Sequence, residues 1–202
     1  TTGTCVFVPN TVACEDGDLC TLSERCLGGS CQGGIPQVTT LAGNGLTKVQ
    51  PGNALNVGMA GPRGIALDSV GRIYVSDGHR IARVEPDTAK LTTWAGDEDA
   101  GFVDGAGKEA RFLLPGGLDF APDGKLIIAD TGNHRVRAAS ASGFVETVAG
   151  GSKGFVDGPS NTAQFDTPSD VSVDDLGRIW VADTQNHRLR RIAKDGVVST
   201  VV

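Results

Sequence analysis

Several kinds of residue are scarce in this sequence, and each scarcity excludes a class of protein. Aromatic residues make up 5% of the 202 residues, so any core must consist mainly of Val, Ile, Leu and Ala. No apolar run approaches the ~20 residues that a helix needs to cross a bilayer, so no membrane span is expected. Basic residues are also in deficit, since 18 Lys and Arg stand against 24 Asp and Glu, a net charge of −6. Because nucleic-acid affinity comes largely from cations that neutralise phosphates, nucleic acid is not an expected partner.

Cysteine is absent from the last 171 residues. The first 31 residues contain all five cysteines: Cys5, Cys14, Cys20, Cys26 and Cys31. The change in composition falls near a turn and linker signature, Gly-Gly-Ile-Pro at 33–36. The sequence therefore predicts a Cys-rich module over residues 1–36 and a second domain over residues 37–202.

The Cys-rich segment has too few apolar residues to bury a core of its own size, so disulfides or a metal must hold it. Structural zinc sites use ligands two to four residues apart, often with His, whereas the spacings here are longer and the segment has no His. We therefore expect disulfides, and with them a location outside the cytoplasm, either extracellular or at the cell surface. The number of cysteines is odd, so one pairs outside this segment or stays free, and the connectivity is left open.

Residues 14–34 resemble short Cys-rich repeats of secreted and cell-surface proteins, notably of myxobacteria. The resemblance lies in Cys-x-Asp-Gly-Asp-x-Cys-Thr, followed by Cys-x-Gly-Gly-x-Cys. Asp16, Asp18 and Glu24 offer carboxylates for Ca²⁺, but a calcium loop brings more oxygen ligands at regular spacing. A solvated acidic turn is the favoured interpretation, and no cofactor is expected.

The rest of the chain is a repeat with a period of 53 residues. Pro62, Pro115 and Pro168 begin three copies, and an Asp recurs at 77, 130 and 183. Each copy divides into short apolar runs separated by Gly-containing turns, which are expected at 65–68, 73–75, 81–84 and 91–95 in the first copy. Runs rich in β-branched residues are typical of strands with both faces covered. Four short antiparallel strands in each unit of ~50 residues indicate the blades of a β-propeller, and a β-helix is the alternative fold.

The second and third copies resemble the NHL family. They read Asp-Thr-Gly-Asn-His-Arg-Val-Arg from Asp130 and Asp-Thr-Gln-Asn-His-Arg-Leu-Arg from Asp183, each followed or preceded by a linker with Gly-Phe-Val-Asp-Gly. The resemblance covers residues 38–202 and implies an all-β fold, a partial propeller of four-stranded antiparallel blades. The first copy departs from the pattern, because its turn is two residues shorter and lacks the Asn. It is either an edge blade or a diverged one.

The polar residues after the second strand of each copy could suggest an active site. Their repetition argues against one, because a catalytic site needs different residues in different roles at one place. We expect the Asp to accept backbone N–H groups, the Asn to take a left-handed conformation, and the His and Arg to bridge to the next blade. The residues assigned to these structural turns are Asp77, His79, Arg80, Asp130, Asn133, His134, Arg135, Asp183, Asn186, His187 and Arg188. No catalytic, cofactor-binding or metal-binding residue is predicted.

Three further expectations concern packing and blade number. Phe112 and Phe165 are expected to plug the space between blades, and the Asp-Gly pairs at 104–105 and 157–158 to form turns. The strands expected at 38–42 and 197–202 lead to a count of three full copies plus the first strand of a fourth. Since propellers close with roughly four to eight blades, either the chain is part of a longer protein or several chains complete the ring.

Three functions are compatible with this pattern. The favoured one is a non-catalytic extracellular protein that presents a propeller scaffold to a protein, a glycan or its own copies, the last through open sheet edges. The alternative is a fragment of a metal-dependent lyase or lactonase, which the resemblance to related propellers allows if other blades hold the site. RNA binding, known for some NHL domains, is disfavoured by the charge balance and the Cys-rich segment.

Overall fold

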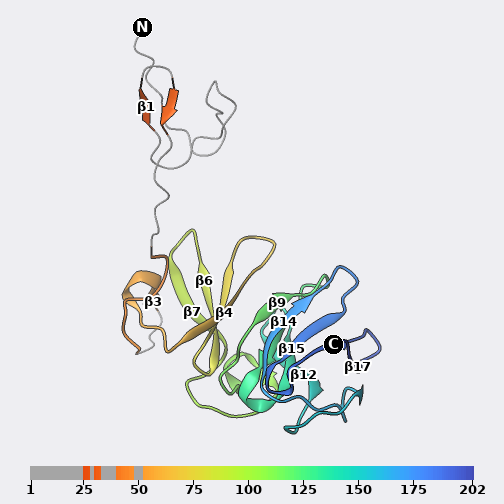
Figure 1. The fold of residues 1–202 in the computed structure, drawn as a ribbon. Coiled ribbons are helices and arrows are strands. Elements are labelled where there is room, and N and C mark those ends of the chain that lie inside the picture. Colours follow the sequence, from red (N-terminus) through yellow and green to blue (C-terminus); the bar gives the residue numbers. More distant parts are fainter. Residues whose placement is uncertain (1–24, 28–29, 33–39, 48–51) are drawn as a thin grey trace. The chain divides into compact units, whose positions relative to one another are not determined.

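The computed structural model describes the backbone of residues 25–27 and 30–32, and residues 40–47 and 52–202 in full (Figure 1). The chain divides into two compact units, Thr1–Thr39 and Thr40–Val202. In the first unit, β1 (Arg25–Leu27) pairs antiparallel with β2 (Ser30–Gln32), and Cys26 lies opposite Cys31 in the register. Cys5, Cys14 and Cys20, and the acidic residues considered for calcium, lie outside the described residues.

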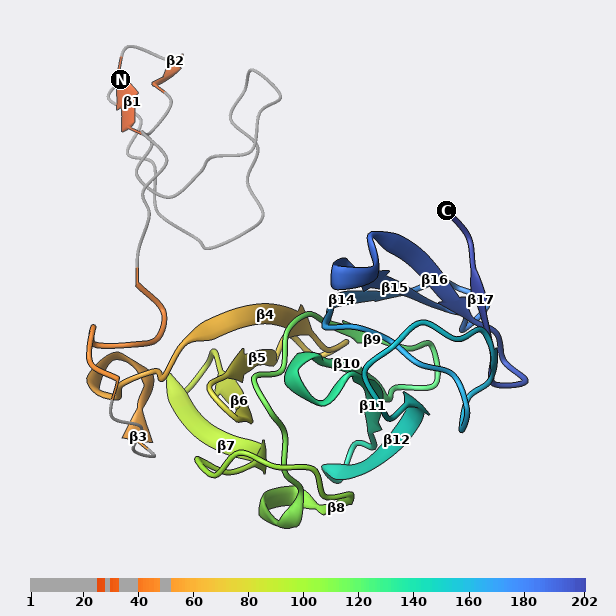
Figure 2. The ribbon, with the colours of Figure 1, turned by 60° about the horizontal axis from the view of Figure 1, so that its bottom comes forward.

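The second unit consists of three antiparallel sheets, which we call blades 1, 2 and 3 in chain order (Figure 2). Blade 1 contains β4 (Pro62–Leu67), β5 (Ile73–Asp77), β6 (Arg80–Glu85), β7 (Lys90–Gly96) and β3 (Gly52–Asn53). Blade 2 contains β9 (Leu118–Phe120), β10 (Leu126–Asp130), β11 (Arg135–Ala139), β12 (Phe144–Gly150) and β8 (Gly105–Ala106). Blade 3 contains β14 (Pro168–Val173), β15 (Ile179–Asp183), β16 (Arg188–Ile192), β17 (Val197–Thr200) and β13 (Gly158–Pro159).

The expectation of four strands per blade was wrong, because each sheet has five. The fifth strand is a two-residue segment of the linker that precedes the blade, and it pairs with the outermost strand, as Gly105 does with Val145. Gly105 and Gly158 therefore begin short edge strands and are not residues of plain Asp-Gly turns. Two residues are too few to show an alternating pattern, which is why the sequence gives no signal for this strand.

The count of blades also changes. Val197–Thr200 pairs with β16 on one side and with β13 on the other, so it completes the third sheet and does not start a fourth. Of the strand expected at 38–42, residues 38–39 lie outside the described residues and 40–42 are not in a strand. The described part of the chain therefore holds three complete blades.

The turns follow from glycine and aspartate chemistry. Gly71, Gly124 and Gly177 have φ values of 84°, 83° and 72° and close the hairpin between the first two long strands of their blades. Only glycine adopts this left-handed region at no steric cost.

The helices of the described residues are short 3₁₀ turns: η1 (Ala54–Asn56), η2 (Gly107–Glu109), η3 (Thr131–Asn133) and η4 (Thr184–Asn186). None of the described helices is long and apolar enough to cross a membrane.

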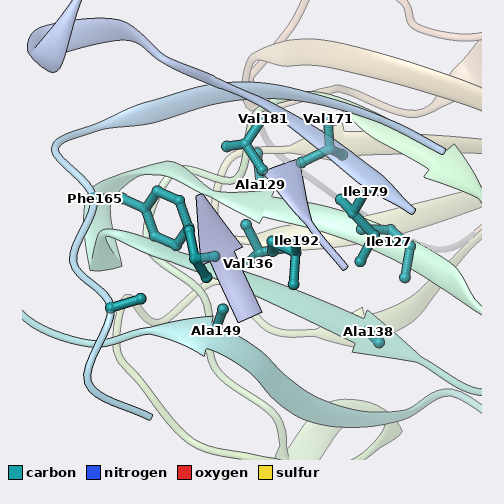
Figure 3. Close-up of a cluster of buried hydrophobic side chains, with 12 residues drawn as sticks. Ile127, Ala129, Val136, Ala138, Ala149, Phe165, Val171, Ile179, Val181 and Ile192 are labelled. Atoms are coloured by element: carbon teal, nitrogen blue, oxygen red, sulfur yellow. The ribbon is translucent and has the colours of Figure 1, made fainter. Parts of the chain in front are cut away.

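The core lies between the blades. Phe165 is fully buried in the cluster that joins blade 2 to blade 3, at the opposite end from Ile127 and Ile179 (Figure 3). Phe112 is equally buried in the matching cluster between blades 1 and 2. Each blade is thus too thin to bury its own apolar faces and relies on its neighbour.

Candidate functional site

The Asp that ends the second long strand of blade 2 is a buried hydrogen-bond acceptor. Asp130 Oδ1 accepts the backbone N–H of Leu113 at 2.9 Å, and Oδ2 accepts the Nδ2 of Asn133 at 2.8 Å. Arg137 donates to the same Oδ2 at 2.8 Å, and both side chains of this ion pair have no exposed surface. Burial raises the pKa of Asp130, against the lowering effect of these hydrogen bonds. The group joins the linker, the turn and the third strand of one blade.

Blade 3 repeats the arrangement. Asp183 accepts the N–H of Asp166 at 2.7 Å, Nδ2 of Asn186 at 2.9 Å and the guanidinium of Arg190 at 2.7 Å. In both blades the Asn also donates to a linker carbonyl, that of Gly101 or of Gly154, at 2.8 Å. Because both carboxylate oxygens of each Asp and the amide of each Asn already have partners within the fold, the group acts as a structural lock.

Blade 1 builds the lock differently. Its turn is two residues shorter, and Arg80 donates to Asp77 Oδ2 through Nε at 3.1 Å and Nη2 at 2.6 Å. Asp77 Oδ1 accepts the N–H of Gly61 at 2.8 Å. A shallow hollow of about 190 Å³ lies beside this turn, next to His79 and Glu98.

Two of the three histidines, His79 and His134, link neighbouring blades. His134 Nδ1 accepts the N–H of Thr167 at 3.0 Å, and His79 Nδ1 accepts that of Leu114 at 3.2 Å. His134 and His187 have φ values of 55° and 52°, so the left-handed residue of the turn is the His and not the Asn as expected. The Asn instead ends the 3₁₀ turn, which aims its amide at the buried Asp.

Sequence reasoning missed two arginines at the centre of these locks. Arg137 and Arg190 are fully buried in the third strand of their blades. Each also binds a linker carboxylate, Arg137 to Asp104 at 2.6 Å and Arg190 to Asp157 at 2.7 Å. Their recurrence seven residues after the buried Asp was the available signal, but an Arg in a strand is ordinarily taken as exposed.

The linker carboxylates accept hydrogen bonds from the last long strand of each of blades 2 and 3. Asp157 accepts both the N–H and the hydroxyl of Thr200, at 3.0 and 3.2 Å, and Asp104 does the same with Thr147. Burial acts to raise the pKa of Asp157, but the bonds from Thr200 and Arg190 outweigh it, and the pKa lies below its usual value.

The linkers also leave an aromatic and cationic pair on the surface of each of the last two blades. Arg135 stacks over the ring of Phe102 with its guanidinium carbon 3.6 Å from the ring centroid, and Arg188 stacks over Phe155 at 4.1 Å. Both rings remain exposed, at 41% and 43%. We call Phe102, Arg135, Phe155 and Arg188 the Phe–Arg surface. It is the candidate binding site that the described residues offer.

The two tryptophans do not contribute to this surface. Trp94 packs edge-on against Tyr74, with 4.9 Å between ring centroids, beside the core of blades 1 and 2. Trp180 donates its Nε1–H to Asp174 at 3.2 Å. Within the part of the chain that the structure describes, no group of three or more His, Cys, Asp or Glu side chains is arranged to hold a metal ion.

Comparison with known proteins gives one family match and several structural neighbours. Residues 112–138 and 165–192 match the NHL repeat, which is a smaller part of the chain than the resemblance over residues 38–202 in the sequence analysis. NHL repeat-containing protein 2 of Gallus gallus is 36% identical over 92 residues, which are 45% of this chain and 12% of that protein.

Two solved structures have a fold similar to that of this chain. An auxiliary nutrient binding protein from Bacteroides ovatus ATCC 8483 has a TM-score of 0.57 and 26% identity, over 68% of this chain and 37% of that chain. Virginiamycin B lyase from Staphylococcus aureus has a TM-score of 0.51 and 18% identity, over 76% of this chain and 44% of that chain, a likeness of fold alone. This chain spans less than half the length of each of these three proteins.

Proposed function

From the premise that residues 112–138 and 165–192 are NHL repeats in an all-β propeller-like fold, we propose that this chain is a non-catalytic extracellular binding protein. Its blades form a rigid scaffold that presents surfaces to a protein, a glycan or its own copies. The observation that carries the proposal is that the repeated Asp and Asn of the turns and the buried Arg of the third strand are engaged in hydrogen bonds within the fold, as Asp130 and Arg137 are. The Phe–Arg surface is exposed and can contact a partner.

The chemistry of the Phe–Arg surface fits a protein or glycan ligand. An exposed ring such as Phe102 offers an apolar face to a sugar or an apolar side chain, and the arginine stacked on it offers N–H donors. The stacking also holds both groups in place, so little conformational freedom is lost when a ligand binds. The similar structure from Bacteroides ovatus is that of an auxiliary nutrient binding protein, and this supports a binding role.

The proposed location rests on the cysteines of residues 1–36. Five cysteines in a segment with few apolar residues favour disulfides, which persist in oxidising compartments. Mass spectrometry of the chain from an oxidising host, with thiols alkylated before and after reduction, tests this. We expect four alkylated cysteines to appear only after reduction. Five free thiols in the unreduced protein would contradict the proposed disulfides and location.

Binding through the Phe–Arg surface is tested on a glycan array and on a panel of immobilised extracellular proteins. We expect saturable binding that EDTA does not reduce and that the double variant Phe102→Ala, Phe155→Ala weakens at least tenfold. Phe144→Ala is the matched control, because Phe144 is also exposed but lies on the outer strand β12 and is not part of the Phe–Arg surface. Stoichiometric bound metal together with turnover of a lactone or a lyase substrate would overturn the non-catalytic proposal in favour of the enzyme alternative.

A further inference from the structure

The third strand begins with an arginine in all three blades, and this arginine lies opposite the buried Asp in the register. Arg80 pairs with Asp77 in this way, and Arg135 pairs with Asp130. In blade 1 the guanidinium of Arg80 donates to Asp77, and only 2% of Arg80 is exposed. The residue two positions further along that strand is Ala82, so Arg80 itself supplies the counter-charge of the buried Asp.

In blade 2 a second arginine supplies this counter-charge. Arg137 stands where blade 1 has Ala82, and it binds Asp130 at 2.8 Å. Arg135 forms no ion pair with any residue that the structure describes. Its one hydrogen bond to the described residues runs from Nη1 to the carbonyl of Gly150, at 3.4 Å. Blade 2 therefore presents at its surface an arginine whose counterpart in blade 1 is buried and paired.

The unpaired charge of Arg135 does not arise at an end of the chain. The linker that follows blade 2 runs beside it, since a Cβ on Gly151 would lie 3.5 Å from its Nη1. Burial and the charge of Arg137 lower the pKa of Arg135 below its ordinary value, so the protonated form lacks full compensation where it lies. Arginine nevertheless stays protonated at neutral pH. A bound anion would supply the missing compensation.

Blade 3 repeats the arrangement. Arg190 binds the buried carboxylate of Asp183 at 2.7 Å, and Arg188 stacks over Phe155 with 4.1 Å between its guanidinium carbon and the ring centroid. Arg188 is exposed, and among the described residues its hydrogen bonding consists of one bond from Nη1 to the carbonyl of Asn186, at 3.0 Å. Adjacent repeats therefore offer two equivalent guanidinium groups, each beside an exposed ring.

The linkers around the two stacks differ in charge. The linker before Phe102 contains three acidic residues, at 97–99, whereas residues 151–154 before Phe155 include Lys153 and no acidic residue. Acidic side chains near a cation weaken its attraction for an anion. We therefore expect an anion to bind more tightly at the stack of blade 3 than at that of blade 2.

We propose that the Phe–Arg surface binds an acidic polysaccharide, with uronate carboxylates on its two arginines and sugar rings against its two phenylalanines. This inference rests on the proposed function and names the ligand class of the same surface. A guanidinium presents a planar fork of N–H donors that fits a carboxylate, and an aromatic ring suits the apolar C–H face of a pyranose. A polysaccharide is favoured over a folded protein because its carboxylates recur along the chain, as the two stacks recur in adjacent blades.

Isothermal titration calorimetry of the full chain with polygalacturonate tests the ligand class. Fully methyl-esterified polygalacturonate is the matched neutral polymer, and poly-glutamate is the matched acidic polypeptide. We expect polygalacturonate to bind, the ester to bind at least about tenfold more weakly, and salt to weaken the binding, because each contact to the surface pairs two charges. Equal binding of the ester, or tighter binding of poly-glutamate, would overturn the inference.

The double variant Arg135→Gln, Arg188→Gln tests the site, because it removes both cations and leaves the rings in place. We expect its affinity for polygalacturonate to fall at least about tenfold, with unchanged thermal unfolding. The control is Lys125→Gln, Lys194→Gln, which removes two positive charges beside hairpin turns at the other end of blades 2 and 3. An unchanged affinity in the arginine variant, or an equal loss in the control, would overturn the inference.

Failure of the inference and failure of the proposed function give different results. If polygalacturonate does not bind, but a neutral glycan or an extracellular protein binds and Phe102→Ala, Phe155→Ala weakens that binding, the acidic ligand is overturned and the binding function stands. If no glycan of the array and no protein of the panel binds, the proposed function fails, and the inference fails with it.

Discussion

Arg137 and Asp130 lie on adjacent strands of blade 2, two positions apart in the register, and form an ion pair of 2.8 Å in which neither side chain is exposed. The guanidinium also reaches Asp104 and the carbonyl of Val103 at 2.6 and 2.8 Å. Burying an unpaired charge would lower the stability of the fold strongly, so the ion pair and the carbonyl groups that accept from Arg137 stabilise the fold only together. Blade 3 repeats the unit with Arg190 and Asp183, which marks it as a device of the repeat.

Removing the carboxylate from this unit should cost much of the stability of the fold. We expect Asp130→Ala to lower the free energy of unfolding by about 3 kcal/mol, because Arg137 would lose its buried counter-charge. Urea denaturation at neutral pH measures the change. Glu146→Gln, which breaks the exposed pair with Lys125, is the control and should cost less than about 1 kcal/mol. Equal losses in the two variants would contradict the structural role of the lock.

The plug between blades 2 and 3 gives a second prediction. We expect Phe165→Ala to lower the free energy of unfolding by about 3–5 kcal/mol, because it opens a cavity at a junction where the ring is fully buried. Phe144→Ala, on an exposed ring, should change it by no more than about 0.5 kcal/mol. Thermal and urea unfolding of both variants measure these changes. A loss at Phe165→Ala as small as that at Phe144→Ala would show that the junction between blades 2 and 3 does not depend on Phe165.

Close approach of the blades near the propeller axis gives a third prediction. A Cβ on Gly64 would meet the backbone of Gly116 and Gly117 at 2.4–2.9 Å, which neither strand can relieve by rotating a side chain. We expect Gly64→Ala to separate blades 1 and 2 and to lower the melting temperature. Gly151→Ala is the matched control, since its Cβ would meet only the end of Arg135 at 3.5 Å. A melting temperature equal to that of the control would contradict the packing of the inner strands.

The hairpin of blade 3 gives a prediction for acid. Burial acts to raise the pKa of Asp174, but hydrogen bonds from Arg178 and Trp180 outweigh it and lower the pKa to about 2 from the ordinary 3.8. A carboxylate with a depressed pKa stabilises the fold fully above pH 3.8 and loses this effect as the pH falls through about 2. Asp174→Asn should therefore reduce stability at neutral pH and flatten its dependence on pH in this acid range.

Urea unfolding of wild type and Asp174→Asn at pH 5 and near pH 2 measures this difference. Asp175→Asn alters the adjacent, exposed residue of the same turn and serves as the control. Parallel losses of stability in wild type and Asp174→Asn on acidification would contradict the prediction.

The sequence by itself determined the repeat, the four longer runs of strand in each copy and the all-β class. These follow from local rules, because runs of β-branched residues such as 126–129 and glycines such as Gly124 act through their own backbone and neighbours. The identity of the turn residues, with Asp130 and Asp183 closing their strands, was also visible in the period of 53.

Only the tertiary structure decided which residues the repeat buries and which it leaves free. Arg137 is buried because Asp130 and a linker carboxylate 33 residues away meet it in space, and no local pattern reports such a meeting. Phe102 and Phe112 lie ten residues apart in one linker, yet only the second reaches the junction between blades. Burial depends on what the neighbouring sheet supplies, so the fifth strand and the arginine locks became visible only in the tertiary structure.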